Sequence, residues 1–99
     1  MAAYFVLHNR VTDDEAMQRY IPLAVETLMA HGAEILVVAD DSTVIEGTTD
    51  YPRTVVIRFE DREKAQAWYD CQEYADVRPI RTGATEGYGV LVDGFVLPG

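Results

Sequence analysis

The chain has 99 residues, of which 48% are hydrophobic and 25% are charged, a balance typical of one soluble globular domain. A domain of this size buries roughly 60–70% of the surface that its unfolded chain exposes, so one core can form without disulfides. The formal net charge of -9 disfavours binding to nucleic acid or to an anionic membrane, because both need clustered lysine and arginine.

Cysteine content and the ends of the chain predict where the protein works. The single cysteine, Cys71, excludes an internal disulfide and a cysteine-based zinc cluster. The N-terminus has no basic segment followed by an apolar run, and no apolar stretch approaches the ~20 residues of a membrane helix. We therefore expect a cytoplasmic protein, without a signal peptide or membrane segment, in which residues 1–99 form a single domain.

The first third of the chain predicts a strand followed by a helix. Residues 3–8 alternate apolar side chains on both faces, which favours a central strand. Thr12 and Glu15 have the spacing of a capping box that starts a helix, and Gly32 suits its left-handed end. Pro22 predicts a kink within this helix. The predicted apolar face of the helix consists of Met17, Tyr20, Ile21, Ala24 and Leu28.

The middle of the chain predicts three strands. Residues 34–39 form the first of them, and a polar turn leads to a short returning strand over residues 43–47. After a polar loop, residues 54–59 alternate again and predict the next strand.

The last third predicts a helix in two parts and a final strand. The helix opens at residues 60–61, a new helical turn begins near residues 70–71, and Pro79 and Gly83 limit it. Residues 88–92 predict the last strand.

The order is a strand, a helix, a strand hairpin over residues 34–47, a strand, a helix and a strand. It predicts an α+β fold, a ferredoxin-like β-α-β-β-α-β sandwich with the helices on one face of the sheet. The strands carry apolar residues on both faces, so the face without helices needs a cover. We expect a homodimer in which two sheets pack together. The apolar tail, residues 94–99, is predicted to reach across to the partner.

Residues spread over nearly the whole chain resemble a known family. The matching positions are Tyr20, His31-Gly32, Glu46-Gly47, Pro52-Arg53, Phe59, Ala65, Trp68-Tyr69, Glu73-Tyr74, Arg78 and Arg81. On these residues the chain resembles domain of unknown function 1330, a small bacterial family in the dimeric α/β barrel superfamily. The family usually has serine in place of Cys71, a better N-cap, and a second glycine in place of Ala33.

The resemblance implies the ferredoxin-like fold and a dimer, and it implies no particular reaction. Superfamily relatives include small monooxygenases, haem-degrading enzymes, muconolactone-type isomerases and stress-response proteins. A fold shared with these proteins does not transfer their chemistry to this chain.

Two candidate catalytic residues are His8 and Glu46. Histidine is the common acid–base group near neutral pH, although His8 at a strand end also fits an ordinary edge histidine. Glu46 and Arg53 flank a polar loop, and their pairing has two interpretations. They form a structural ion pair, or Glu46 is a general base while Arg53 holds an anionic substrate.

The candidate ligand-binding residues, besides Arg53, lie in the second helical region. Tyr69 and Glu73 share a face if the helix is continuous, and Tyr74 adds a second hydroxyl. Arg78 and Arg81 are three residues apart and suit an anion or carboxylate site. The same groups also fit a buried structural network, and Trp68 is interpreted as a core residue.

Three functions follow from these residues. The first is an enzyme acting without a metal on a small organic molecule that is aromatic or carries a carboxylate. Its site would lie between sheet and helices and use His8, Glu46, Arg53, Tyr69 and Arg81. The second is a non-catalytic binding module, and the third is a structural or stress-associated homodimer. No phosphate loop, nucleophile elbow or paired histidines are present, so no metal or cofactor is expected.

Overall fold

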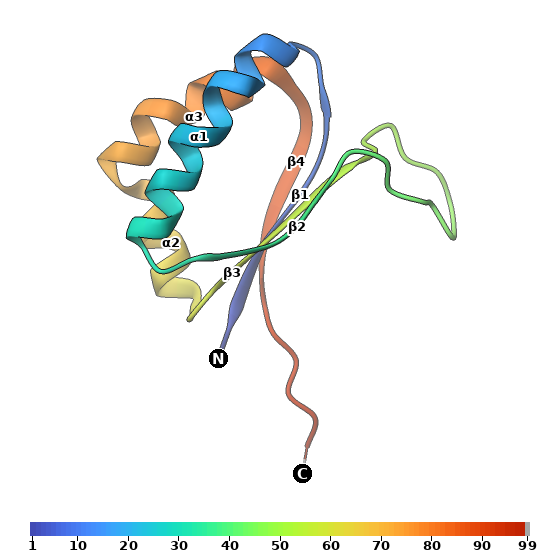
Figure 1. Cartoon of the computed structure of the whole chain (residues 1–99). Helices are drawn as coiled ribbons and strands as arrows, with labels where there is room; N and C mark the ends of the chain where they lie inside the picture. The colour runs from blue at the N-terminus through green and yellow to red at the C-terminus, as the bar shows by residue number, and fades with distance from the viewer. Residues whose placement is uncertain (99) are drawn as a thin grey trace.

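The computed structural model describes residues 1–98, which form four strands and three helices around one core (Figure 1). The order of elements confirms the predicted α+β class, with the second helical region divided into two helices. The elements are β1 (Ala3–Val11), α1 (Asp14–Ala30), β2 (Glu34–Ala39), β3 (Arg53–Phe59), α2 (Arg62–Asp70), α3 (Gln72–Ala84) and β4 (Thr85–Asp93).

The four strands form one antiparallel sheet in the order β2-β3-β1-β4. Leu7 of the central β1 faces Val55 of β3 on one side and Gly89 of β4 on the other. This is the strand order of a ferredoxin-like sheet. It confirms the predicted fold and the central place predicted for the first strand.

All three helices lie on one face of the sheet, as predicted (Figure 1). On that face β3 presents Val55, Ile57 and Phe59, which are buried with Trp68 and Tyr74 from the helices. Full burial of side chains of this size stabilises the fold by roughly 1.5–3 kcal/mol each. Trp68 therefore belongs to the core, as interpreted from the sequence.

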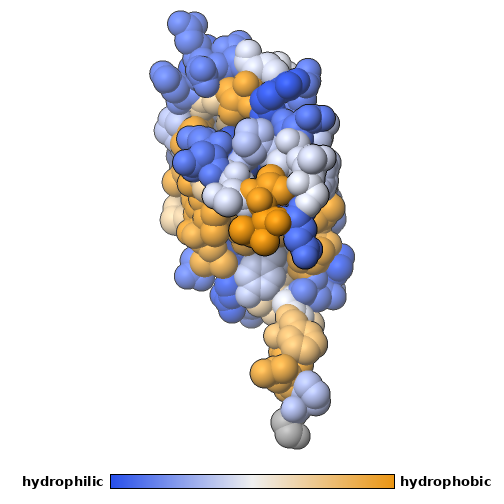
Figure 2. All heavy atoms as spheres, turned by 90° about the vertical axis from the view of Figure 1, so that its right-hand side faces the viewer, coloured by the Kyte–Doolittle hydropathy of each residue, from blue (hydrophilic) through white to orange (hydrophobic). Residues whose placement is uncertain are grey.

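The other face of the sheet is uncovered. It carries exposed Tyr88, Val90 and Val92 of β4, and the tail adds exposed Phe95 and Leu97. Figure 2, seen from the side away from the helices, shows hydrophobic side chains on this face and along the tail. Residue 99, the last of the predicted tail, lies outside the described residues.

The N-terminus of α1 differs from the prediction. Asp13, not Thr12, is the N-cap, and its carboxylate accepts the amide N–H of Ala16 at 3.1 Å. The predicted capping box is wrong because the Thr12 N–H is occupied by the Ala84 carbonyl at the end of α3, at 2.7 Å. The helix continues through Pro22 and ends, as predicted, before Gly32. No helix within residues 1–98 is long and apolar enough to cross a membrane.

The predicted strand over residues 43–47 is wrong. Residues 40–52 form an irregular loop, and the Ser42 N–H donates to the Pro52 carbonyl at 2.9 Å at its base. β2 pairs directly with β3, and this leaves no strand beside Ile45, which is exposed.

The helical region restarts at Cys71, close to the predicted position. Cys71 is extended, with φ -66° and ψ 152°, and its Sγ accepts the Tyr74 N–H at 3.4 Å. Sulfur therefore caps this helix at the position where the family that the sequence resembles usually has serine. α3 then runs past Pro79 to Ala84, one residue beyond Gly83, so neither residue ends it as predicted.

Gly87 offers a test of how closely β4 packs on β1. Its φ is 141°, and an added Cβ would lie 2.2 Å from the His8 carbonyl oxygen. Gly87→Ala is expected to lower the free energy of unfolding by about 2 kcal/mol or more, because backbone cannot move aside. The control Gly83→Ala, where an added Cβ meets nothing within 4 Å, is expected to raise it by about 0.5–1 kcal/mol. Urea denaturation measures both, and an unchanged Gly87→Ala would contradict the close approach.

Candidate functional site

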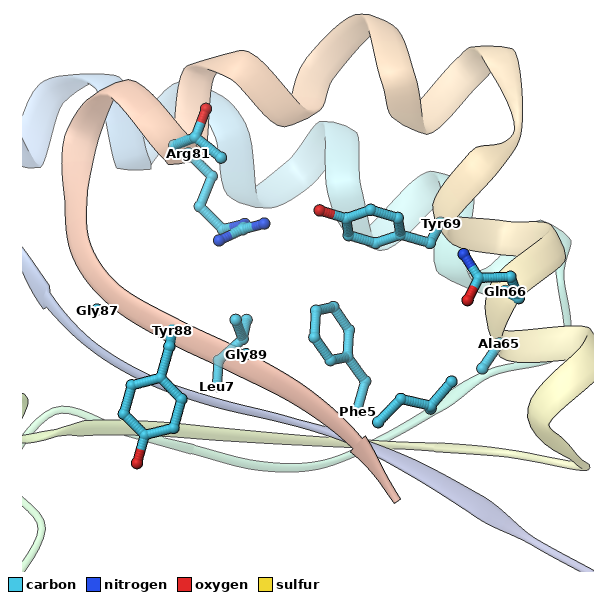
Figure 3. Close-up of a pocket in the computed structure, with 11 residues that line it drawn as sticks. Phe5, Leu7, Ala65, Gln66, Tyr69, Arg81, Gly87, Tyr88 and Gly89 are labelled. Atoms are coloured by element: carbon cyan, nitrogen blue, oxygen red, sulfur yellow. The ribbon is translucent and has the colours of Figure 1, made fainter. Parts of the chain in front are cut away.

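A cavity of about 340 Å³ lies between the sheet and the helices α2 and α3 (Figure 3). Its walls are mainly apolar or aromatic, and they come from β1, β4 and the two helices. Its lining residues include Phe5, Leu7, Leu91, Ala65, Tyr69 and Arg81.

The orientation of the side chains gives the cavity one charged wall. In Figure 3, Phe5 and Leu7 point from the sheet toward the helices, and Arg81 points from α3 toward the sheet. Tyr69 extends from α2 across the cavity, with its hydroxyl toward Arg81. Tyr88 also borders the cavity, but its ring points away to the opposite face. A ligand in the cavity would therefore meet apolar and aromatic side chains, one guanidinium group, and the uncharged polar side chains of Gln66 and Thr82.

A glycine in β4 makes room for the floor of the cavity. A Cβ added at Gly89 would lie 2.6 Å from Phe5 Cε1 and 2.7 Å from Leu7 Cδ2. The two side chains therefore lie directly against the backbone of β4. Any larger residue at position 89 would push them into the cavity.

Arg81 is a buried cation without an anionic partner among residues 1–98. It is 8% exposed, and its Nε donates to Tyr74 Oη at 3.3 Å. Tyr74 Oη in turn shares a hydrogen bond of 2.6 Å with Tyr20 Oη. The ion pairs of the described residues involve other arginines, and none includes Arg81.

These contacts shift the pKa values of the first and last residues in this series of hydrogen bonds. Burial, with Tyr74 beside it, raises the pKa of Tyr20 far above its ordinary range. Burial alone would lower the pKa of Arg81, but the hydroxyls of Tyr74 and Tyr20 outweigh it and raise that pKa. Tyr20 therefore stays a neutral phenol, and Arg81 stays charged, at any physiological pH.

Three of the predicted binding residues lie around the cavity. Tyr69 and Arg81 line it, and Tyr74 is fully buried behind Arg81. Arg53 is buried on the same face of the sheet, where it lines a second cavity of about 80 Å³ together with Arg81.

His8 lies on the uncovered face of the sheet, so it does not join the cavity. Its Nδ1 is 3.2 Å from Thr54 Oγ1, which is 2.6 Å from Ser42 Oγ. Its ring also lies beside Tyr88, with centroids 5.8 Å apart. The single cleft predicted for His8, Tyr69 and Arg81 is therefore divided between the two faces of the sheet.

Glu46 lies in the exposed loop, and the predicted ion pair with Arg53 is wrong. Arg53 Nε is 3.2 Å from Asp40 Oδ1 instead. The pairing of Ala39 with Thr54 explains this, because it places the next residue of each strand end, Asp40 and Arg53, side by side.

Glu73 and Arg78 also lie outside the cavity. The helix break at Cys71 separates Glu73 from the face of Tyr69, and Glu73 borders a groove between α1 and α3. Arg78 donates to the Tyr69 carbonyl at 2.9 Å, and its Cζ lies 4.4 Å from the centroid of the Tyr69 ring. Arg78 therefore supports a wall of the cavity from outside.

Asn9 was not among the predicted site residues. It is 2% exposed, and neither its Nδ2 nor its Oδ1 has a hydrogen-bond partner among residues 1–98. The signal was present in the sequence, since Asn9 follows Leu7 by two residues and so places a polar side chain on the core face. Within the same residues, no group of three or more His, Cys, Asp or Glu side chains could hold a metal ion.

The comparisons with known proteins give a family and a fold. Residues 2–95 match the family described as Domain of unknown function (DUF1330). No curated protein is similar to the chain. A protein of unknown function from Rhodopseudomonas palustris, RPA0582, has 9% identity and a TM-score of 0.81, covering 97% of this chain and 84% of its own.

Two further solved structures share the fold at low identity. A dimeric ferredoxin-like protein of unknown function from Jannaschia sp. CCS1 has 14% identity and a TM-score of 0.69, covering 97% and 100% of the two chains. SnoaB, a cofactor-independent oxygenase from Streptomyces nogalater, has 7% identity and a TM-score of 0.66, covering 97% and 95%. At these identities the likeness shows the fold alone.

The raised pKa of Tyr20 predicts the behaviour of the protein in alkali. The unfolded chain ionises this phenol near pH 10, and the folded protein does so only at higher pH. The contribution of Tyr20 to the free energy of unfolding is therefore fully present below about pH 10, and it falls by up to about 1.4 kcal/mol per pH unit above that. Urea denaturation between pH 8 and 11 is expected to show a shallower fall for Tyr20→Phe. Parallel curves for the two proteins would contradict this assignment.

Proposed function

The chain belongs to the DUF1330 family, and from the geometry of its cavity we propose that it binds a small organic anion with an aromatic or apolar body. The observation that carries the proposal is the buried guanidinium of Arg81. It points into a mainly apolar cavity whose other polar side chains, Gln66 and Thr82, are uncharged. Its partner is a tyrosine hydroxyl, and no carboxylate lies within 4 Å of it among residues 1–98 (Figure 3).

A charge in this position favours an anionic ligand. Burying a cation costs several kcal/mol unless a counter-charge and hydrogen bonds compensate for the lost water. Tyr74 accepts a hydrogen bond from Nε of Arg81, and no carboxylate of the described residues pairs with this guanidinium. A carboxylate or phenolate oxygen of a ligand would supply the counter-charge, and the planar fork of arginine suits two oxygens of a carboxylate at once.

The walls support an apolar or aromatic body for this anion. Phe5, Leu7 and Leu91 offer apolar surface, and the Tyr69 ring stands edge-on to Phe5 at 5.8 Å. A volume of about 340 Å³ is at the small end of ligand sites, which suits a molecule of one or two rings.

A second candidate function is an enzyme, favoured by the same arginine. A fixed cation beside a substrate oxygen stabilises negative charge that develops there during a reaction. SnoaB, one of the similar structures, is described as a cofactor-independent oxygenase. No His, Asp, Glu or Cys lines the cavity among residues 1–98, so catalysis there would rest on stabilising a substrate anion. Acid–base roles for His8 and Glu46 would need another surface.

We also propose that the chain forms a homodimer through the uncovered face of the sheet. The exposed Tyr88, Val90 and Val92 support this, as does the dimeric protein from Jannaschia. The exposed tail residues Phe95 and Leu97 would add apolar surface to the same contact.

Replacement of Arg81 tests the binding proposal. Benzoate and phenol are titrated into the whole protein, with binding followed by amide chemical shifts. Arg81→Met is expected to weaken benzoate binding at least tenfold, about 1.4 kcal/mol, and to affect neutral phenol much less. Arg62→Met, which removes an exposed arginine on α2, is the control. Equal benzoate affinity in the wild type and Arg81→Met would overturn the proposal. Mass spectrometry of the recovered ligands separates a binder, which returns them unchanged, from an enzyme.

Replacement of Val90 tests the homodimer. Val90 on the uncovered face and Leu23 on α1 are equally exposed, at 42% each. Val90→Asp is expected to convert the dimer to a monomer in sedimentation velocity, because it places a charge in an apolar contact. Leu23→Asp is expected to leave it dimeric. A wild-type monomer, or a dimer that tolerates Val90→Asp, would contradict packing through this face.

A further inference from the structure

A second, smaller cavity adjoins the candidate site and shares two of its walls. It has a volume of about 80 Å³ and lies between α1 and the strands β2 and β3. Leu7 and Arg81 line both cavities, so the two cavities adjoin at these side chains. Apart from the arginines Arg53 and Arg81 and the hydroxyl of Tyr20, the lining of the smaller cavity is apolar.

Arg53 gives this cavity a second buried cation. The residue is 7% exposed, whereas its ion-pair partner Asp40 has a side chain that is 87% exposed. The two groups of this ion pair therefore lie in different environments, because the carboxylate is exposed to solvent and the guanidinium is buried. Two buried cations, Arg53 and Arg81, thus line one small cavity, in a protein whose net charge is -9.

Asn9 lies beside Arg53 on the same face of the sheet. The two residues are directly paired across β1 and β3, which places their Cβ atoms about 4.5–5.5 Å apart. The same Asn9 is paired on its other side with Gly87, which lines the larger cavity. Its amide is buried and has no partner among residues 1–98. An unpartnered buried amide is costly, and native proteins rarely keep one without a role.

We propose that the ligand is a diacid, an apolar or aromatic body that carries two acidic groups. One carboxylate binds Arg81 in the larger cavity. The second binds Arg53 in the smaller one and reaches the amide of Asn9, which is paired with Arg53 on the sheet. This inference rests on the proposed binding of an organic anion at Arg81 and adds the class of that anion. The second carboxylate supplies the counter-charge of Arg53 in place of the exposed Asp40, and it accepts the free Nδ2–H of Asn9.

The test compares a ligand that carries one carboxylate with ligands that carry two. Calorimetric titration of the whole protein uses benzoate and the 1,2-, 1,3- and 1,4-benzenedicarboxylates, which span three separations of the acidic groups. At least one diacid is expected to bind tenfold tighter than benzoate. Arg53→Met and Asn9→Leu are each expected to reduce this ratio below threefold. Asp40→Asn is expected to increase diacid affinity, because it removes the competing carboxylate.

Arg58→Met is the matched control, because Arg58 lies on the same strand as Arg53 and its side chain is on the opposite face, 45% exposed. It is expected to keep the wild-type ratio. A ratio near one in the wild type, or a tenfold ratio that survives Arg53→Met, overturns the diacid. If benzoate and the diacids all fail to bind, the proposed anion site itself fails, which is a different outcome.

A measurement on the wild type guards against variants that do not fold. The Nε–H resonance of Arg53 and the side-chain amide of Asn9 are followed by NMR while each acid is added. Both are expected to move with the preferred diacid and to stay in place with benzoate. Resonances of Arg53 and Asn9 that stay in place at saturating diacid would overturn the inference even if the diacid binds tightly.

Discussion

A chain of hydrogen bonds through Tyr20, Tyr74 and Arg81 holds one positive charge inside this protein, and the candidate site depends on it. Tyr20 belongs to α1, and the other two residues belong to α3, so these hydrogen bonds join two helices that are distant in sequence. Buried hydroxyls need partners, and a buried guanidinium needs them more strongly. The three groups therefore determine one another's positions, and the charge is directed toward the sheet.

Because the helices cover only one face of the sheet, its two faces form different kinds of surface. On the helix side, α2 and α3 meet at Cys71, so Tyr69 before the break and Arg81 after it face one cavity. Gly89 opens the floor beneath them. On the uncovered side, His8 lies in a polar chain with Thr54 among apolar neighbours. The first surface is the proposed site of a small organic anion, and the second is the proposed contact of a homodimer.

The fold was largely predictable, because its signals are local. Alternation in residues 3–8 and 54–59, the glycine at 32 and the restart near residues 70–71 each report backbone geometry of a few neighbouring residues. The predictions that failed were those decided by contacts between residues distant in sequence. Val44 and Ile45 have strand propensity, but no strand lies beside them, and the Thr12 N–H was taken by α3.

The sequence by itself determined the element order, apart from the strand wrongly predicted over residues 43–47. It also determined the apolar face of the first helix, which carries Tyr20, and the presence of arginines among aromatic residues. Only the tertiary structure decided which of these groups meet. The sheet register placed Arg53 beside Asp40 and Asn9, and it left Glu46 in solvent. Periodicity is a property of neighbouring residues, whereas a site is made by residues whose separation along the chain says nothing of their distance in space.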